Sequence, residues 1–412
     1  MRVELVAPFE IIAQHSLSGF RKFRLERMAA IDVGNPAADS QTWQTLSLFG
    51  REDLIAAVSK DYAPERCAPL TTASPLFDEI VGRARKTSIV IISESHERTE
   101  HRGFITEVAA RLRPIGYDTL AIEALVNAPP GTPEANWPPF RKEPALPFFS
   151  EGDGHYIEEA GFGRLGRRAK ALGYRLLPYE IVQENRPTSE MSVQQQIAVR
   201  EEAQARNLAA FLGDHPGAKL LIHVDYSHAT EVPRSDGSRW MASRLKSLTG
   251  IDPLTISQTL CRGNGKKVRL SALPESQPAG SFDLLVDHPN VRFVQGRPEW
   301  RRRTGDRAVA IPPALRPTKG WRVIEARSLG EPDTAIAMDR VAIRPGEDIA
   351  LMLPPGRYRI RAIDLASSEY YEEMHNRMKD DVRGNEELRR ILEDDKITVK
   401  ELGGWECSKC HY

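Results

Sequence analysis

The feature that most restricts the fold of this chain is a regular alternation of short apolar segments and amphipathic segments between residues 88 and 258. The apolar segments have the length and composition of strands, and they cover residues 88–92, 119–122, 174–178, 219–224 and 254–257. Segments with a 3.6-residue apolar period separate them, around 104–112, 162–172, 193–212 and 240–248. Strand–helix alternation of this kind predicts an α/β fold, in which a largely parallel sheet is flanked by helices.

The chain of 412 residues is longer than one ordinary domain. We expect residues 86–280 to form the α/β catalytic domain, with residues 1–85 packed on it as an N-terminal segment. Short strand-like segments between glycine and proline turns predict a small antiparallel β unit over 281–365. Residues 366–412 form an acidic tail that is expected to be mostly helical or flexible, and the proline-rich insert 129–149 predicts a loop or lid.

The charge balance excludes some classes of partner. Lys plus Arg equals Asp plus Glu at 57 each, so no global field attracts nucleic acid or an anionic membrane. No apolar segment approaches the ~20 residues that span a bilayer, and the N-terminus lacks the apolar core of a signal peptide. A cytoplasmic protein is therefore expected, with Cys67 and Cys261 as separate reduced thiols. Whether it forms a homo-oligomer stays open.

Polar side chains follow each predicted strand at its carboxyl end. In chain order they are Glu94 and His96, then Glu123, then Glu180, then His223, Asp225 and His228, and finally Gln258. Because the carboxyl ends of parallel strands meet at one edge, where such sheets bind their ligands, these side chains are expected to converge on an active site. His101, in the first turn of the following helix, belongs either to this site or to the surface.

Two kinds of chemistry fit the residues at this edge. Glu94, His96, Glu123 and His228 form a mixed nitrogen and oxygen set that suits Zn, Mn or Fe(II). The same side chains can also act without a metal, with a histidine as general base toward water and a glutamate that orients it. Both interpretations remain open.

Four residues are candidates for binding a substrate: Arg164, Glu180, Arg200 and Asn207. Arg200 and Asn207 lie seven residues apart, two turns along one helix face. An arginine at such a position can bind a substrate carboxylate or balance the acidic cluster. The chain has neither the glycine-rich phosphate-binding motifs nor the G-x-S-x-G nucleophile elbow.

The motifs resemble a known group, the erythromycin esterase/ChaN-like superfamily, which is related to the Tiki and TraB proteins. The resemblance covers about residues 85–260 and rests on SESHERTEHRGFITEVAARLRPIGYDTLAIEAL, FGRLGRRAKALGYRLLPYE, REEAQARNLAAFL and LLIHVDYSHATEV. It implies an α/β core with a Glu/His site, in a group that includes macrolide-lactone esterases, a haem-binding lipoprotein and metal-dependent proteases. Carried over by motif, it assigns Glu94, His96, Glu123 and His228 to the site and matches Arg200 and Asn207.

Two positions depart from the family pattern. Ser93 and Asp225 stand where the family usually has glycine, and neither has the backbone freedom of glycine. The geometry of the site, and with it the reaction, can therefore differ from that of the esterases in the family. Asp225 becomes a candidate for an additional metal ligand.

The tail ends in WECSKCHY, in which Cys407, Cys410 and His411 form a C-x-x-C-H pattern. The bare pattern matches c-type haem attachment, and two thiolates with a histidine also make half of a zinc site. A polar helical segment followed by Gly-Gly and a Cys-bearing end resembles, in addition, the leader and core of a ribosomally made, modified peptide.

The sequence therefore predicts a metal-dependent enzyme that hydrolyses an ester or amide bond. The alternatives are iron-dependent modification of a Cys-containing peptide like the chain's own tail, and a haem- or metal-binding protein without turnover. The expected cofactor is a divalent metal (Fe, Mn or Zn), with haem as the alternative. The expected partner is a small ester or amide or a Cys-containing peptide.

Overall fold

A computed structural model describes residues 2–17, 19–32, 39–59, 67–182, 185–187, 191–234, 237–263 and 266–365. The predictions for the tail, with Cys407 and Cys410, lie outside the described residues.

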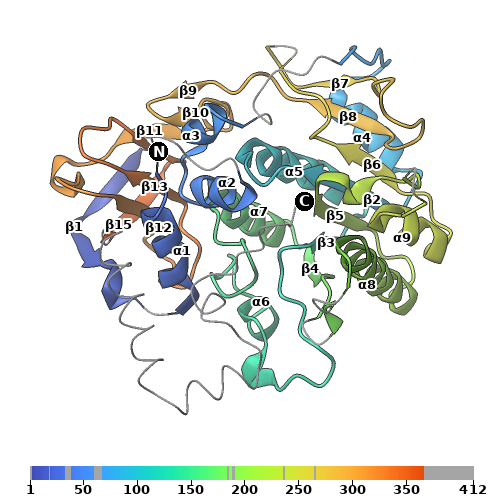
Figure 1. Ribbon diagram of the computed structural model, residues 1–412, viewed down its shortest axis with the longest axis horizontal. Helices are drawn as coiled ribbons and strands as arrows, with labels where there is room; N and C mark the ends of the chain where they lie inside the picture. The colour runs from blue at the N-terminus through green and yellow to red at the C-terminus, as the bar shows by residue number, and fades with distance from the viewer. Residues whose placement is uncertain are drawn as a thin grey trace.

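The centre of the fold is a seven-stranded sheet with the order β4-β3-β5-β2-β6-β8-β7 (Figure 1). All neighbours are parallel except the edge strand β7, which is antiparallel to β8. The prediction of a largely parallel sheet flanked by helices is confirmed. The bounds are β2 Ile89–Glu94, β3 Thr119–Ile122, β4 Arg175–Pro178, β5 Leu220–Asp225, β6 Leu254–Ser257, β7 Arg269–Ser271 and β8 Leu284–Asp287.

Helices cover both faces of this sheet, which explains why residues 89–92 of β2 are all apolar. Val90 and Ile92 pack into one core cluster with helices α4, α5 and α7, while Ile89 and Ile91 pack into a second cluster with α8 and α9. Alternate residues of a strand point to opposite faces, so a strand between two helical layers needs apolar residues at every position. The helices are α4 Leu76–Ala84, α5 Thr99–Leu112, α7 Ala160–Ala171, α8 Val193–Asp214 and α9 Met241–Thr249.

A smaller sheet joins the beginning and the end of the described chain. Strand β1 (Val3–Ala13) pairs in parallel with β15 (Gly356–Asp364), beside the antiparallel strands β12 (Arg322–Ser328) and β13 (Asp339–Ile343). In Figure 1 the blue β1 lies next to β15 on the left. The remaining short pairs are β9 Phe293–Val294 with β10 Arg297–Pro298, and β11 Arg307–Ala310 with β14 Ala350–Leu353.

Buried ion pairs and one close packing contact hold the smaller sheet against the helices that follow the central strands. Arg164 of α7 donates to Asp306 over 2.6 Å, and Arg301 of α10 (Trp300–Arg303) lies 2.5 Å from Asp339. Trp300 packs on Gly103 of α5, where an added Cβ would lie 2.6 Å from the indole ring. Arg164 and Gly103 therefore connect α7 and α5 to residues 300–306, and the Arg301–Asp339 pair ties these residues to β13.

The N-terminal region also packs on the central core. Leu25 of α1 (Gly19–Ala29), Leu46 of α2 (Ser40–Leu48) and Ile55 of α3 (Glu52–Ala56) belong to the core cluster that contains α5 and α7. The insert 129–149 includes the short helix α6 (Pro139–Lys142) and the 3₁₀ turn η4 (Glu134–Asn136). Within the described residues, none of the helices has the length and apolar character needed to cross a membrane.

The expectation that Cys67 and Cys261 are separate reduced thiols is wrong, because the two form a disulfide across 194 residues of sequence. The segment that begins at Cys67 runs beside β7, where Ala272 N–H donates to Ala68 O, and this brings it to the chain that leaves β6. Spacing along the sequence could not reveal this approach. Disulfides persist mainly in oxidising compartments, so the pair weighs against the cytoplasmic prediction.

Replacing Cys67 and Cys261 together by serine is expected to lower the free energy of unfolding by about 2–4 kcal/mol, the usual contribution of a disulfide that closes a long loop. Urea denaturation of the wild type and the double variant measures the difference. Peptide mapping after alkylation without reductant provides the control: alkylated Cys67 and Cys261 in the folded wild type would contradict the disulfide.

Candidate functional site

Three neighbouring strands bring acidic and imidazole side chains to one edge of the central sheet. Strand β2 ends at Glu94 and β5 ends at Asp225, and these two residues are paired in the strand register. Glu123 directly follows β3, and the 3₁₀ turn η6 (Tyr226–Ala229) places His228 just after β5. The predicted convergence at the carboxyl edge is therefore present.

Asp225 lies between two histidines. Its Oδ2 atom is 2.9 Å from His96 Nε2, and its Oδ1 atom is 2.8 Å from His228 Nε2. The other ring nitrogen of His228 contacts the buried carboxylate of Glu201 on α8, and that of His96 lies 3.4 Å from Glu94. Along this series of contacts carboxylates and imidazoles alternate, in the order Glu94, His96, Asp225, His228 and Glu201.

Glu94 is fully buried and is held by cationic and imidazole groups. Its Oε1 accepts a 2.7 Å hydrogen bond from Arg102, and its Oε2 lies 2.9 Å from His223 Nε2. The Arg102 guanidinium packs on the rings of Tyr156 and Phe162, with centroids at 5.2 and 4.5 Å. Burial favours the neutral acid, but the charge of Arg102 outweighs it and, with His223, holds the Glu94 pKa well below its usual value.

Glu123 belongs to a second group, organised by side chains of α8. Arg200 contacts both Glu123 and Glu180, at 2.5 Å for Glu180 Oε2, and Gln204 donates to Glu123 Oε1 over 2.9 Å. Burial, reinforced by the negative charge of Asp225, raises the pKa of Glu123 to about 7 despite the neighbouring arginine. Arg200 and Glu180 therefore lie beside Glu123 at the carboxyl edge of the sheet, and their role in binding a substrate stays a prediction.

Glu123, Asp225 and His228 offer one ligand atom each, and these atoms lie within 4.8 Å of one another. Asp225 Oδ1 is buried and lies 2.8 Å from His228 Nε2, so that one cation that replaces the proton on Nε2 would contact both atoms. Two carboxylates and an imidazole are also a donor set of catalytic metal sites, so the residues fit a divalent ion.

The protonation of the two histidines follows from this arrangement. Burial opposes a charge on His96, yet its hydrogen bonds to Asp225 and Glu94 prevail and raise its pKa to about 10. Burial likewise opposes a charge on His228, but Asp225 and Glu201 outweigh it and raise the pKa well above the usual range. Without a metal ion, both imidazoles thus carry positive charge that compensates the carboxylates.

This gives a pH-dependent stability for chelator-treated protein. The folded state holds the His96 proton up to a pKa of about 10, against 6.5 for the free side chain. The contribution is therefore complete below about pH 6.5 and is lost as the pH rises toward 10. We expect urea unfolding between these values to show a steeper loss of stability in the wild type than in His96→Gln. His215→Gln, at an exposed position after α8, serves as the control and should keep the wild-type slope.

Some predicted residues lie apart from this group. Arg164 contacts Asp306 and the carbonyls of Met338 and Met352 in the boundary with the smaller sheet, so the structure does not bring it to the site. Asn207 donates to the carbonyls of Tyr179 and Glu180, and it thereby fixes the chain that carries the Glu180 side chain.

His101, which the sequence left between site and surface, is fully buried beneath the turn that carries His96. Its Nδ1 accepts from Ser95 N–H over 2.9 Å. Gln258 donates to Ser93 O over 3.0 Å and faces His288 at 2.8 Å. His101 and Gln258 therefore hydrogen-bond to the backbone at the carboxyl end of β2 and hold it in place.

Sequence reasoning missed Arg102, Glu201 and Gln204. The buried residues of α8 are Glu201, Gln204, Ala205 and Leu208, which form an i, i+3, i+4, i+7 stripe. A glutamate on the buried stripe of a helix needs a partner, so the spacing alone could have identified Glu201. Arg102 gave no comparable signal, because an arginine in the first two turns of a helix is usually solvated.

The fold and the geometry together define the class of protein: a mixed α/β protein whose seven-stranded, mostly parallel sheet carries a Glu/Asp/His cluster at its carboxyl edge. No protein-family profile matches the chain. No curated protein sequence matches it either.

Solved structures give a more distant similarity. The type III effector HopBA1 is 17% identical with a TM-score of 0.34, and the match covers 54% of this chain and 97% of that one. ChaN of Campylobacter jejuni, which binds haem cofacially, is 10% identical with a TM-score of 0.31, covering 51% and 91%. RRSP, a MARTX toxin effector domain from Vibrio vulnificus, is 14% identical with a TM-score of 0.33, covering 57% and 42%.

Similarities at this level carry no argument about function. ChaN is one of the names in the resemblance seen in the sequence, whereas no family profile and no curated sequence links the chain to the erythromycin esterases. Membership of that superfamily therefore stays a prediction.

Proposed function

We propose that this protein is a metal-dependent hydrolase of ester or amide bonds, with a divalent cation held by Glu123, Asp225 and His228. The observation that carries the proposal is the convergence of these three buried side chains, whose ligand atoms lie within 4.8 Å of one another. Three protein ligands leave coordination positions for water and substrate, as in catalytic metal sites. The mixed donor set favours Zn, Mn or Fe(II).

The charge of the site supports a cation. Six carboxylates lie in the two connected groups, and among the described residues two guanidinium groups, those of Arg102 and Arg200, pair with them. The carboxylates are Glu94, Glu123, Glu159, Glu180, Glu201 and Asp225. Glu123, with its pKa raised to about 7, is partly neutral at neutral pH. At least three negative charges then need compensation by protonated histidines or by a metal ion, because uncompensated buried charge is costly.

Each side chain has a distinct role in this proposal. A divalent ion at the cluster would polarise the scissile carbonyl and lower the pKa of an attacking water. His96, whose side chain is 22% exposed and whose protonated ring is hydrogen-bonded to Asp225, is placed to act as general acid and give a proton to the leaving group. Arg200, 25% exposed, presents its guanidinium beside Glu123 to stabilise negative charge on the substrate oxygen.

The test combines metal content with turnover. We expect elemental analysis of the purified protein to find about one equivalent of Zn, Mn or Fe, and the Asp225→Asn/His228→Ala variant to lose it. Hydrolysis on panels of esters and peptides should fall by at least about a thousandfold in the same variant, the scale of losing a catalytic metal. His215→Gln, an exposed change, should leave both measurements unchanged.

Three other results of these measurements would each favour a different interpretation of the protein. A Soret band without turnover would make the protein a haem-binding module and overturn the hydrolase. Hydrolysis that persists in metal-free protein would overturn the metal and leave catalysis to the histidine and glutamate side chains alone. A mass change confined to the tail, absent in Cys407→Ser or Cys410→Ser, would replace hydrolysis by peptide modification.

A further inference from the structure

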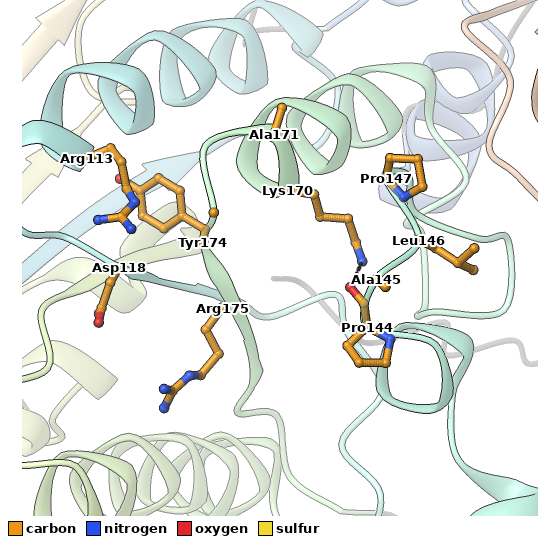
Figure 2. Close-up of a pocket in the computed structure, with 11 residues that line it drawn as sticks. Arg113, Asp118, Pro144, Ala145, Leu146, Pro147, Lys170, Ala171, Tyr174 and Arg175 are labelled. Carbon is orange, nitrogen blue, oxygen red and sulfur yellow. Dashed lines mark hydrogen bonds between the residues drawn. The ribbon is translucent and has the colours of Figure 1, made fainter.

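A second concave site lies at the amino-terminal edge of the central sheet, the edge opposite Glu123 and Asp225 (Figure 2). Its volume is about 530 Å³. Its walls are residues 144–147 of the insert, the end of α7, and the starts of β3 and β4. Strand β3 separates Asp118 in this pocket from Glu123 in the candidate active site, a length of about 13 Å at ~3.3 Å per residue. The two sites are therefore separate.

The pocket is rich in cations. Arg113, Lys170 and Arg175 line it, against the single carboxylate of Asp118. Within the part of the chain that the structure describes, none of these three cations forms a salt bridge with a carboxylate. Figure 2 shows Lys170 reaching from α7 to the insert, where it donates to Pro144 O over 3.2 Å. The lining thus carries a formal charge of two positive units.

Helix ends account for part of this charge but not for all of it. Arg113 donates to Leu172 O over 2.8 Å, and so it caps the carboxyl end of α7. The ends of α5 and α7 contribute roughly half a negative charge each, which leaves about one positive unit. Lys170 bonds to no carbonyl of these helix ends among the described contacts, and the Arg175 guanidinium lies over the ring of Phe211 on α8, 5.7 Å from its centroid. Burial lowers the pKa of Lys170 and Asp153 offsets this only in part, as expected for a weakly compensated ammonium group.

The other wall is apolar. Pro144, Leu146 and Pro147 come from the insert, and Tyr174 lines the pocket beside Arg113. Tyr174 is almost fully buried, and its hydroxyl donates to Ala109 O over 2.8 Å, so that its ring has a fixed position. An apolar wall that faces a cationic wall selects a ligand with the same two parts.

We propose that this pocket binds an organic anion, with a carboxylate or phosphomonoester head at the Lys170 ammonium group on the cationic side of the lining and an apolar body against residues 144–147. Guanidinium and ammonium groups bind such heads through charge-assisted hydrogen bonds. The insert, which the sequence predicted as a loop or lid, here supplies a wall of the pocket. This inference does not depend on the proposed hydrolase.

Calorimetric titration of chelator-treated protein tests it with three probes of similar size: phenyl phosphate, benzoate and the neutral benzyl alcohol. We expect phenyl phosphate or benzoate to bind and benzyl alcohol not to bind. Lys170→Gln/Arg175→Gln should weaken binding by about tenfold or more, the scale of losing hydrogen bonds to a charged group. Arg168→Gln, an exposed change on the same helix outside the pocket, should stay within about twofold.

The outcomes are distinct. A preference for phenyl phosphate assigns a phosphomonoester head, and one for benzoate assigns a carboxylate. No binding of either anion by the wild type, equal binding of benzyl alcohol, or unchanged affinity in the double variant would overturn the site. Leu146→Glu adds a carboxylate to the apolar wall and should abolish binding too, which covers the case of a poorly folded double variant. Because the protein in this titration is free of metal, binding of the anion to a metal ion at the candidate active site cannot produce the signal.

Discussion

Arg102→Met is expected to lower the free energy of unfolding by about 3–5 kcal/mol, the range found when one member of a buried ion pair is removed. Arg102 and Glu94 are both fully buried and lie 2.7 Å apart. The methionine keeps much of the apolar packing on Tyr156 and Phe162 but leaves the Glu94 carboxylate with less compensation. Arg102 also donates to His96 O, so the loop that carries His96 loses a hydrogen bond.

Urea denaturation measures this effect, and two further variants interpret it. Arg102→Met/Glu94→Gln removes the carboxylate charge as well and should recover part of the stability, because the cost arises from an unpaired charge. Arg111→Met lies on the same helix at an exposed position over Phe77 and should cost less than about 1 kcal/mol. A loss in Arg102→Met no larger than that of Arg111→Met would contradict our account of the pair.

Glu201→Gln is expected to weaken metal binding by about 10- to 100-fold, the usual effect of removing a carboxylate that orients a metal-binding histidine. Glu201 is fully buried, contacts His228 Nδ1 and accepts a 2.5 Å hydrogen bond from Met241 N–H. Its carboxylate fixes the ring so that Nε2 points toward Asp225. Glutamine keeps the size and one acceptor but not the charge.

Competition with a chelating fluorophore measures the metal affinity of each variant. Glu202→Gln is the matched control, since Glu202 is the next residue of α8 but pairs with Arg206 and Arg244 outside the site. Its affinity should equal that of the wild type. A Glu201→Gln variant with wild-type affinity and an altered unfolding midpoint would mean that Glu201 only supports the fold.

The central sheet could be predicted because its strands are buried on both faces. Uninterrupted β-branched residues such as those at 89–92 have a pattern that few other elements share. The site followed from the sheet, since residues at the carboxyl ends of parallel strands must meet. Glu123, Asp225 and His228 were identified in this way.

The remaining features depend on contacts between distant segments. Strands β7 and β8 are short and follow turns. They contain too few residues for the alternating apolar pattern of a strand to be recognised in the sequence. Arg164 and Arg200 look alike in sequence, yet one pairs with Asp306 and the other with Glu123 and Glu180. The disulfide shows the same limit, because the approach of Cys67 and Cys261 is decided by the packing of other elements.

The parallel pairing of β1 with β15 has a consequence for how the chain folds during synthesis. Val3 is opposite Gly356 in this pair, so the first strand leaves the ribosome long before its partner exists. Until residue 364 has emerged, β1 must remain an unpaired edge, and pairings of such sequence separation close slowly. The smaller sheet is therefore the last part of the molecule to form, and trimming either end of the described chain removes a strand that the other end requires.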